Sequence, residues 1–360
     1  MGRSTRAACG AVMFALAAVA GCADDSTAAH DLVGRFDALR KTRRIPGLAV
    51  AMLRGTTVLV ETGLGVASLE RGDPVTADTP FNIASVTKTI SAVVALRLAE
   101  KGTLDLDRPM SRYDGFAAFC SDVRQAGGVF FTDFACADPS LTLRHVMSME
   151  ANGVPGTRFL YNPPSYSWAS RPMMQMTGRS FSDLTAELVF VPAGMTRSAR
   201  IHRGLPLRED LARTLATPYH VDSEDRVAES PPPGPQGDGA AGGVISTAHD
   251  LARFDLALTN DVLLTEASRE RMWTAGRAPS GAALPYGIGW FVQDYRGETL
   301  VWHSGLWEGA YSAIYLRVPS RRLTLILLAN SDGLWWDNPL DAAMIDRSPF
   351  VQELLAAFPR

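Results

Sequence analysis

Ser85 and Lys88 are the residues whose types and spacing point most directly to chemistry. They stand three apart in FNIASVTKTISAVVAL, residues 81–96. Lysine is rare in this chain, because among its 35 basic residues only Lys41, Lys88 and Lys101 are lysines. A position that needs only a positive charge would carry arginine, which keeps its proton, whereas a desolvated lysine amine can act as a base. The pair therefore predicts a serine activated as a nucleophile.

The spacing of this pair also suits the start of a helix. Residues three apart lie on one helical face, so the Lys88 amine can reach the Ser85 hydroxyl, and a helix N-terminus favours the serine anion. A solvated surface lysine is the simpler alternative, so the pair needs partners. A phenol is a suitable group for moving the serine proton, and PGTRFLYNPPSY, residues 155–166, supplies Tyr161.

With these segments in view, the chain resembles the serine β-lactamase and penicillin-binding-protein superfamily, specifically its class C β-lactamase, esterase and D-amino-acid peptidase branch. The resemblance implies that Ser85 is the nucleophile and Lys88 its lysine. It also implies that Tyr161 is a general base and acid once a nearby cation lowers its pKa. The segments that carry the resemblance, in the family's order, are PFNIASVTKT, LRHVMSM, PGTRFLY, AAGGVISTAHDLARF, YGIGW and WHSGLWEGAYSAIYLRVP, within about residues 80–330.

A third family motif lies on a predicted strand at 303–305, where β-lactamases have Lys-Thr-Gly and esterase-like members often have His-x-Gly. Histidine is largely neutral above its ordinary pKa of about 6.5, so His303 suits a substrate carboxylate less well than lysine would. The resemblance further implies an oxyanion hole made by the backbone amides of Ser85 and Leu306. Substrate contacts are expected from Asn162, His303, Ser304, Gly305 and Trp307.

One position departs from the family pattern. Aligning Tyr161 and Tyr166 on Tyr-Ser-Asn-x-x-Tyr places Pro163 where asparagine normally stands. Proline has no side-chain amide, so that contact is either missing or made by Asn162. Together with His303, this departure favours esters or an unusual peptide as substrates over β-lactams.

These observations predict a serine hydrolase that forms an acyl-enzyme on Ser85, an esterase or peptidase of this branch. A β-lactamase or D,D-carboxypeptidase acting on β-lactams or peptidoglycan stem peptides is one alternative. A catalytically silent binding or sensor module, supported only by Pro163, is another. The Gly-x-Ser-x-Gly pentad of α/β-hydrolases does not occur in the sequence. No metal or organic cofactor is expected, since the cysteines and histidines have no metal-ligand spacing.

The N-terminus reads as an export signal. Arg3 and Arg6 precede an apolar run at 7–20 that is too short to span a bilayer and suits a signal peptide over 1–21. Its end, VAGC, resembles a bacterial lipobox, which implies cleavage before Cys22 and a lipid on its thiol, with 22–30 as a tether to the membrane. Ordinary secretory cleavage is the alternative. Both predict export: the lipid anchor places the protein in the periplasm or cell envelope, and the alternative gives a secreted soluble protein.

The remaining cysteines indicate the redox compartment, and the net charge limits which classes of partner are expected. Cys9 leaves with the signal, so an oxidising compartment favours a disulfide between Cys120 and Cys136, worth about 3 kcal/mol; two free thiols are the alternative. The formal charge of -3 shows no basic stripe, so no nucleic-acid partner is expected. The expected partners are a small-molecule ester, peptide or β-lactam substrate and the membrane.

The hydrophobic periodicity then gives the elements that must position these residues. Strands at both ends of the chain surround a helical middle, which predicts an α/β (α+β) fold of the β-lactamase/transpeptidase-like type, with an antiparallel sheet flanked by helices. Residues 31–80 and 240–360 form the sheet subdomain, and 81–239 the helical subdomain. Helices are expected at 31–43, 85–101, 141–149, 171–188, 247–258 and 340–358, and strands at 47–65 around a turn at 54–56, 286–293, 298–305, 311–318 and 323–330.

Three further residues receive structural interpretations. His145 is expected to be a packed or hydrogen-bonded helix residue rather than a catalyst. Trp335 and Trp336, at the exit of the last strand, are expected to cover the sheet, with exposed aromatics near the site as the alternative. The Pro/Gly-rich stretch at 230–243 is expected to be a loop.

Overall fold

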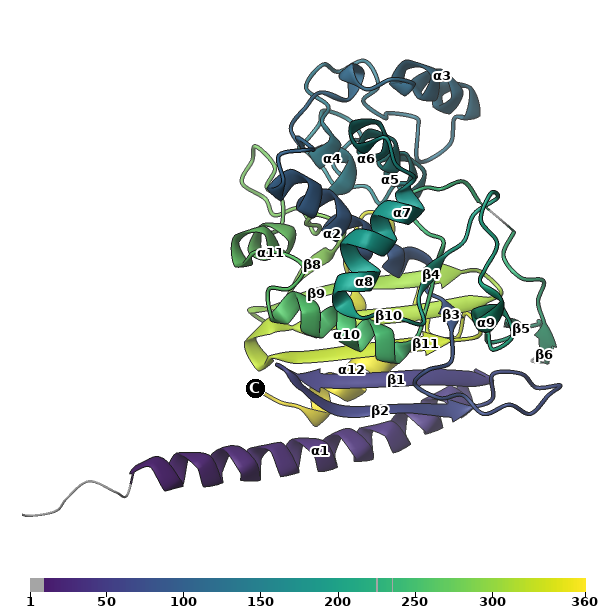
Figure 1. Ribbon diagram of the computed structural model, residues 1–360, viewed down its shortest axis with the longest axis vertical. Coiled ribbons are helices and arrows are strands. Elements are labelled where there is room, and N and C mark those ends of the chain that lie inside the picture. Colours follow the sequence, from purple (N-terminus) through teal and green to yellow (C-terminus); the bar gives the residue numbers. More distant parts are fainter. Residues whose placement is uncertain (1–9, 225, 235) are drawn as a thin grey trace, which may run out of the picture.

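The computed structural model describes residues 10–224, 226–234 and 236–360, with side chains from residue 25 onward. Its centre is a six-stranded sheet in the order β2-β1-β11-β10-β9-β8, with every neighbouring pair whose register is known antiparallel (Figure 1). The strands are β1 (Gly47–Arg54), β2 (Thr57–Gly65), β8 (Phe291–Tyr295), β9 (Glu298–Trp307), β10 (Tyr311–Val318) and β11 (Leu323–Ala329).

Both ends of the chain build this sheet. Strand β1 from the N-terminal part pairs with β11 from the C-terminal part, with Leu48 opposite Ala329. The central strands are continuous apolar runs, because helices cover both of their faces and leave no solvent-facing side. Helix α10 (Ala248–Thr259) lies in front of the sheet in Figure 1 and α12 (Pro349–Ala357) behind it. The predicted fold class is therefore confirmed.

The helical region lies beyond the β8 edge of the sheet, opposite the β2 edge (Figure 1). Its core residues and those of the sheet belong to one continuous buried cluster. The other α-helices of the described residues, some of which flank the sheet, are α2 (Thr87–Glu100), α3 (Phe116–Ala126), α4 (Leu143–Met147), α5 (Pro163–Trp168), α6 (Ser170–Thr177), α7 (Phe181–Thr185), α8 (Val191–Ala193), α9 (Glu209–Ala212) and α11 (Glu266–Met272).

Two small sheets complete the architecture. One has the order β3-β7-β4, with β3 (Phe81–Asn82), β7 (Val244–Ser246) and β4 (Ala199–Arg200). The other pairs β5 (Tyr219–Val221) with β6 (Val227–Glu229).

Several predicted elements are confirmed. The β1–β2 hairpin turns at 54–56 as expected. Thr247 caps α10, because its hydroxyl accepts a hydrogen bond from the Asp250 amide at 3.0 Å. The described residues of 230–243 contain no helix or strand.

Three element predictions were wrong in extent. The helix expected over 171–188 breaks at Gly178, whose left-handed φ of 68° ends α6, and it restarts after Ser180, which caps α7. The first C-terminal strand begins at Phe291 rather than 286. The last helix covers only 349–357, preceded by a short 3₁₀ turn at 345–347.

The N-terminal helix differs as well. Helix α1 spans Gly10–Thr42, so it continues through residues 22–30, which were expected to be a tether, and Ala29 is buried. Residues 1–9 of the predicted signal peptide lie outside the described residues, as does the side chain of Cys22. Across the described parts of the chain, no helix has the length and apolar character needed to cross a membrane.

Candidate active site

Ser85 lies on a 3₁₀ turn, Ala84–Val86, that joins strand β3 to helix α2. Ala84 has a left-handed φ of 45°, a conformation that non-glycine residues rarely adopt and that the surroundings must hold in place. Asn82 does this locally, since its side-chain oxygen accepts a hydrogen bond from the Ala84 amide at 2.9 Å. Strand β3 in turn pairs with β7, with Phe81 opposite Ser246. The serine is thus held by regular structure.

Lys88 is fully buried one helical turn after Ser85. Its Nζ donates hydrogen bonds to the Ser85 Oγ at 2.9 Å and to the Ala241 carbonyl at 2.9 Å. It also lies 5.2 Å from the centre of the Tyr161 ring and 5.6 Å from that of Tyr166. Burial lowers the pKa of Lys88 to about 7. A large fraction of the enzyme therefore carries a neutral amine at neutral pH, next to the serine hydroxyl.

Tyr161 lies beside the same pair, but its acidity is the reverse of the sequence-based expectation. Burial raises the pKa of its phenol, and the interaction with the Ser85 side chain offsets this only in part. The nearby Lys88 does not produce the lowered pKa that was expected of Tyr161. The phenol therefore carries its proton at neutral pH, which makes it a proton donor, and Lys88 is the better base.

Strand β9 carries the predicted third motif past the Ser85 turn. Gly305 is required there, because a Cβ at this position would lie 2.3 Å from the Ile83 carbonyl oxygen. Ser304 and Leu306 both line the cavity at Ser85. The structure therefore brings the two residues of the expected oxyanion hole, Ser85 and Leu306, to one cavity wall. Trp307 is only partly buried and packs against the core outside this wall.

His303 does not face the cavity, contrary to the expected substrate contact. It is fully buried, with its Nδ1 2.6 Å from the Ser304 carbonyl oxygen and its Nε2 2.9 Å from the Tyr286 hydroxyl. Burial, with the charge of Lys88, holds the pKa of His303 well below its ordinary value. The ring lies behind Tyr161, with centroids 5.9 Å apart, and stays neutral. Strand alternation explains the error, since His303 and Ser304 point to opposite faces.

Asn162 also lies elsewhere than predicted. Its side chain is 1% exposed and fully engaged: the oxygen accepts from the Ser165 amide at 3.1 Å, which caps α5, and the Nδ2 donates to the Phe130 carbonyl and the Asn152 side chain. Asn162 therefore does not replace the amide that Pro163 lacks. Pro163 itself lines the cavity and presents an apolar ring there.

The cavity above Ser85 has a volume of about 320 Å³ and a mostly apolar wall. Sequence reasoning missed the part of this wall that comes from the loop after β11. Trp335 belongs to it rather than covering the sheet, whereas Trp336 packs against Trp302 as expected. No local sequence pattern places this loop at the cavity. Its position depends on a long-range contact, in which the Tyr161 amide donates a hydrogen bond to the Leu340 carbonyl at 2.7 Å. The lining residues are Ser85, Tyr161, Pro163, Phe291, Ser304, Leu306, Trp335, Asn338, Pro339 and Leu340.

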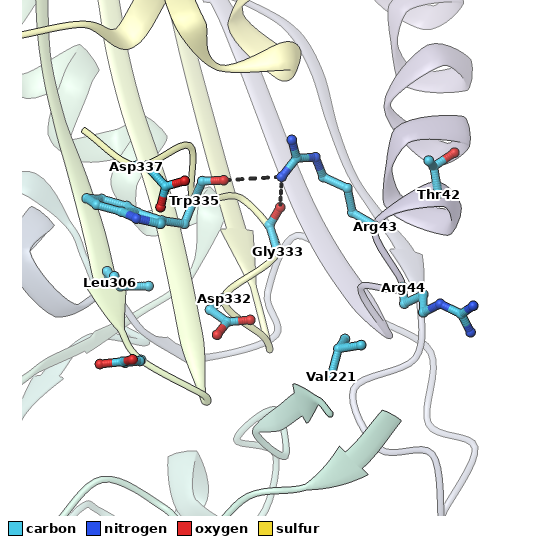
Figure 2. Close-up of a pocket in the computed structure, with 10 residues that line it drawn as sticks. Thr42, Arg43, Arg44, Val221, Leu306, Asp332, Gly333, Trp335 and Asp337 are labelled. Atoms are coloured by element: carbon cyan, nitrogen blue, oxygen red, sulfur yellow. Dashed lines mark hydrogen bonds between the residues drawn. The ribbon is translucent and has the colours of Figure 1, made fainter. Parts of the chain in front are cut away.

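A second, larger cavity of about 710 Å³ adjoins the first and shares Leu306 and Trp335 with it (Figure 2). Its wall carries charges of both signs. Figure 2 shows the Arg43 side chain reaching from the end of α1 to the carbonyls of Gly333 and Trp335, with bonds of 3.4 and 3.2 Å. Trp335 is thus held by its backbone at the boundary between an apolar and a charged cavity.

The remaining candidates have structural surroundings. His145 forms a capping box with Thr142, whose amide and hydroxyl lie 3.1 and 3.0 Å from its Nδ1, in line with the predicted structural role. Cys120 and Cys136 form a disulfide, so the bonded alternative is the one realised. Within the described residues, no three His, Cys, Asp or Glu side chains gather as a metal site would require.

A serine hydroxyl bonded to a buried lysine, beside a phenol and a cavity, is the arrangement expected of a serine hydrolase. The sequence profile described as Beta-lactamase matches residues 32–346, and the chain belongs to this family. The predicted superfamily and reaction class are thereby confirmed.

Individual relatives agree with this assignment. The chain is 27% identical to penicillin-binding protein 4* of Bacillus subtilis (strain 168), over 82% of this chain and 70% of that protein. It is 24% identical to esterase EstB of Burkholderia gladioli, over 90% and 95% of the two chains. The structure of D-amino acid amidase from Ochrobactrum anthropi SV3, complexed with L-phenylalanine amide, shares the fold at a TM-score of 0.69, with 21% identity over 91% and 98% of the chains.

Proposed function

We propose that this protein hydrolyses carboxylic esters through an acyl-enzyme on Ser85. One observation carries the choice of esters: none of the described residues that line the Ser85 cavity is a cation. Cell-wall peptides and β-lactams bear a carboxylate that needs a positive partner, but His303 is buried and neutral where β-lactamases have lysine. An uncharged ester needs no such partner.

The size and polarity of the cavity narrow the substrate further. The walls from Pro163, Phe291 and Leu340 are apolar, and about 320 Å³ accommodates a small apolar group. Pro163 also removes the side-chain amide that would hydrogen-bond a peptide substrate. We therefore propose that short-chain apolar esters are preferred over amides.

The geometry supports a first step in which Lys88 is the base. As the Ser85 Oγ attacks the ester carbonyl carbon, its proton passes to the neutral Lys88 amine at 2.9 Å. The carbonyl electron pair moves to oxygen, where the backbone amides of Ser85 and Leu306 would stabilise the negative charge. The tetrahedral intermediate then collapses, and the leaving alkoxide takes a proton from the Tyr161 phenol, which Lys88 reprotonates.

Hydrolysis of the acyl-enzyme completes the cycle. Water attacks the acyl carbon, and the neutral Lys88 amine accepts its proton directly or through Tyr161. The Ser85 oxygen leaves as the bond to the acyl group breaks, and it takes the proton back from Lys88. The resting enzyme is restored, and no proton is gained or lost on the protein over the cycle.

Intact mass spectrometry tests this proposal. The purified protein is incubated with a p-nitrophenyl ester, a penicillin and a fluorophosphonate, beside a Ser85→Ala control. We expect a fluorophosphonate adduct on Ser85, absent from the control, and turnover of the ester. Turnover of penicillin but not of esters would instead support the β-lactamase or D,D-carboxypeptidase alternative. A folded protein that forms no adduct would support the binding or sensor module.

We also propose that the protein is exported and held at the membrane by a lipid on Cys22. The basic residues, the short apolar run and the VAGC sequence at 19–22 support this, and a Cys120–Cys136 disulfide suits an oxidising compartment. Fractionation of cells that express the full chain tests it. The wild type should sediment with membranes, whereas Cys22→Ser should not be lipidated; equal distribution of both would contradict the anchor.

A further inference from the structure

The loop closed by the Cys120–Cys136 bond, residues 120–136 and here called the disulfide loop, contacts the segment that carries Tyr161. Its Phe130 carbonyl accepts two side-chain hydrogen bonds, from Asn162 at 2.7 Å and from Asn152 at 3.0 Å. Asn162 and Asn152 are also bonded to each other at 3.0 Å. Because Asn162 directly follows Tyr161, this buried cluster ties the loop to the proposed proton donor.

A second contact ties the loop to the other end of the same helix. Trp168, the last residue of α5, stacks on Phe119 with centroids 5.4 Å apart, and Phe119 directly precedes Cys120. Phe119 also packs edge-on against Phe134 inside the loop at 5.9 Å. Helix α5 is therefore held at its first turn by Asn162 and at its last by Trp168, both against the disulfide loop and its start.

Helix α5 passes this restraint to the catalytic centre. The Tyr166 hydroxyl, in the middle of the helix, donates to the Lys88 carbonyl at 3.0 Å. Tyr161 precedes Asn162, the N-cap of this helix, and the centre of its ring lies 5.2 Å from the Lys88 amine. A shift of α5 would thus move the Tyr161 phenol relative to Ser85, which is held separately on the 3₁₀ turn before α2.

The loop needs its cross-link to serve as a support. It has its own bonds to the chain after α4, since Asp133 accepts from Asn152 at 2.9 Å and pairs with Arg158, and the Ala135 amide donates to Ala151. Much of 121–130, however, is solvent-exposed, and this segment, which contains the second half of α3, lies at the edge of the molecule in Figure 1. Opening the bond adds chain entropy to this segment and loosens the Phe130 carbonyl.

We propose that Asn162 and the disulfide loop position Tyr161 for proton transfer to the leaving group, so that kcat depends on whether the Cys120–Cys136 bond is closed. This inference rests on the proposed ester hydrolysis only for its kinetic consequence. The bond opens by exchange with a dithiol. One thiolate attacks a cystine sulfur and forms a mixed disulfide, releasing the first cysteine thiolate. The second thiolate of the reagent then attacks the reagent sulfur of the mixed disulfide, which releases the second cysteine and leaves the dithiol oxidised to a disulfide.

The first test separates two roles of Asn162: its hydrogen bonds to Phe130 and Asn152, here called the Asn162 tether, and its capping of α5. Asn162→Ser keeps an oxygen that can cap α5 but removes the donors to Phe130 and Asn152. We expect kcat for an ethyl ester to fall about ten- to hundredfold, with KM within about twofold, because a displacement of about 1 Å has effects of this size. A p-nitrophenyl ester should be affected far less, since its phenolate leaves without a proton. A merely destabilised enzyme would lose both activities together.

The second test opens the loop without touching Tyr161 or α5. The double variant Cys120→Ser/Cys136→Ser should show the same selective loss on the ethyl ester, and reduction of the wild type by dithiothreitol should reproduce it. Dithiothreitol should not change the double variant, which controls for other effects of the reductant. Equal kcat for oxidised wild type, the double variant and Asn162→Ser would overturn the proposal.

A readout that needs no turnover keeps the two proposals distinguishable. Amide hydrogen exchange of residues 160–168 should accelerate in both variants, while that of α2 stays unchanged. If the wild type hydrolyses no ester but this exchange pattern appears, the positioning of the Tyr161 segment by Asn162 and the disulfide loop is supported and the ester assignment is wrong. If exchange at 160–168 is unchanged in both variants, the tether itself is wrong.

Discussion

The two halves of the catalytic centre are held in different ways. Ser85 lies on the 3₁₀ turn between β3 and α2, and Lys88 lies in the first turn of α2, so both are held by hydrogen-bonded backbone structure. Tyr161 lies between elements, and its place depends on side-chain bonds to the disulfide loop and on a backbone bond to Leu340. The nucleophile and base are therefore built into the fold, whereas the proton donor is attached to it by tethers.

This difference predicts that substitutions in the two halves of the catalytic centre have different effects. A residue held by regular structure is displaced only when the fold is lost, so changes there act through chemistry alone. A residue held by tethers can move while the fold persists. Substitutions at Ser85 and Lys88 should thus act on every substrate, and those around Tyr161 should discriminate between leaving groups.

The largest effect is expected from Lys88→Arg, which keeps the positive charge but removes a group that can lose its proton. Acylation by any ester should fall about 10⁴-fold, as for the loss of a base that acts as a unit with its serine. Stopped-flow measurement of the acyl-enzyme with a p-nitrophenyl ester checks this. Near-normal acylation would show that Lys88 contributes charge rather than base strength, and would remove the distinction between the two halves.

Tyr161→Phe should cost less and act selectively. Loss of the phenol proton should lower kcat for an ethyl ester about 10²- to 10⁴-fold, the range for general acid catalysis. The p-nitrophenyl ester should lose much less. Steady-state kinetics on the two esters give the comparison, with Tyr295→Phe, on β8 outside the cavity lining, as a matched control. Equal losses on both esters would place Tyr161 in serine activation instead.

The pH dependence should report Lys88. Because burial lowers its pKa to about 7, the amine is protonated and inactive below that pH and neutral above it. The value of kcat/KM for an ester should rise about tenfold per pH unit from pH 5 to about 7 and then level off. The raised pKa of Tyr161 keeps its proton in place over this range, so no fall is expected up to pH 9. A profile that is flat from 5 to 9 would contradict the neutral-amine base.

The smallest effect is expected at the cavity wall. Trp335→Ala removes the side chain shared by the apolar and charged cavities, so longer acyl chains should enter. The ratio of kcat/KM for an octanoate to that for a butyrate ester should rise about tenfold, the scale of hydrophobic discrimination by a few methylenes. Trp336 packs on Trp302 and does not line the Ser85 cavity, so Trp336→Ala serves as the control. An unchanged ratio would show that the two cavities do not act as one site.

The half that was predicted best from sequence is the one held by regular structure. Ser85 and Lys88 are three apart, on a 3₁₀ turn that runs directly into α2, so their contact follows from helical spacing. The β1–β2 hairpin and the strands β9, β10 and β11 were likewise predicted from local apolar runs. The loop residues Trp335, Asn338 and Leu340 carry no periodic signal, so their place at the cavity was missed or misassigned.

The sequence by itself predicted the candidate nucleophile and base, the family, the alternation of elements and the two cysteines that could pair, because these predictions depend on residue type and on short spacings. Only the tertiary structure decided which way His303 and Asn162 point and how acidic Lys88 and Tyr161 are. Their burial depends on partners far along the chain, such as Ala241 for Lys88 and Leu340 for Tyr161. Burial changes the cost of holding charge, and it exists only once those distant segments have packed together.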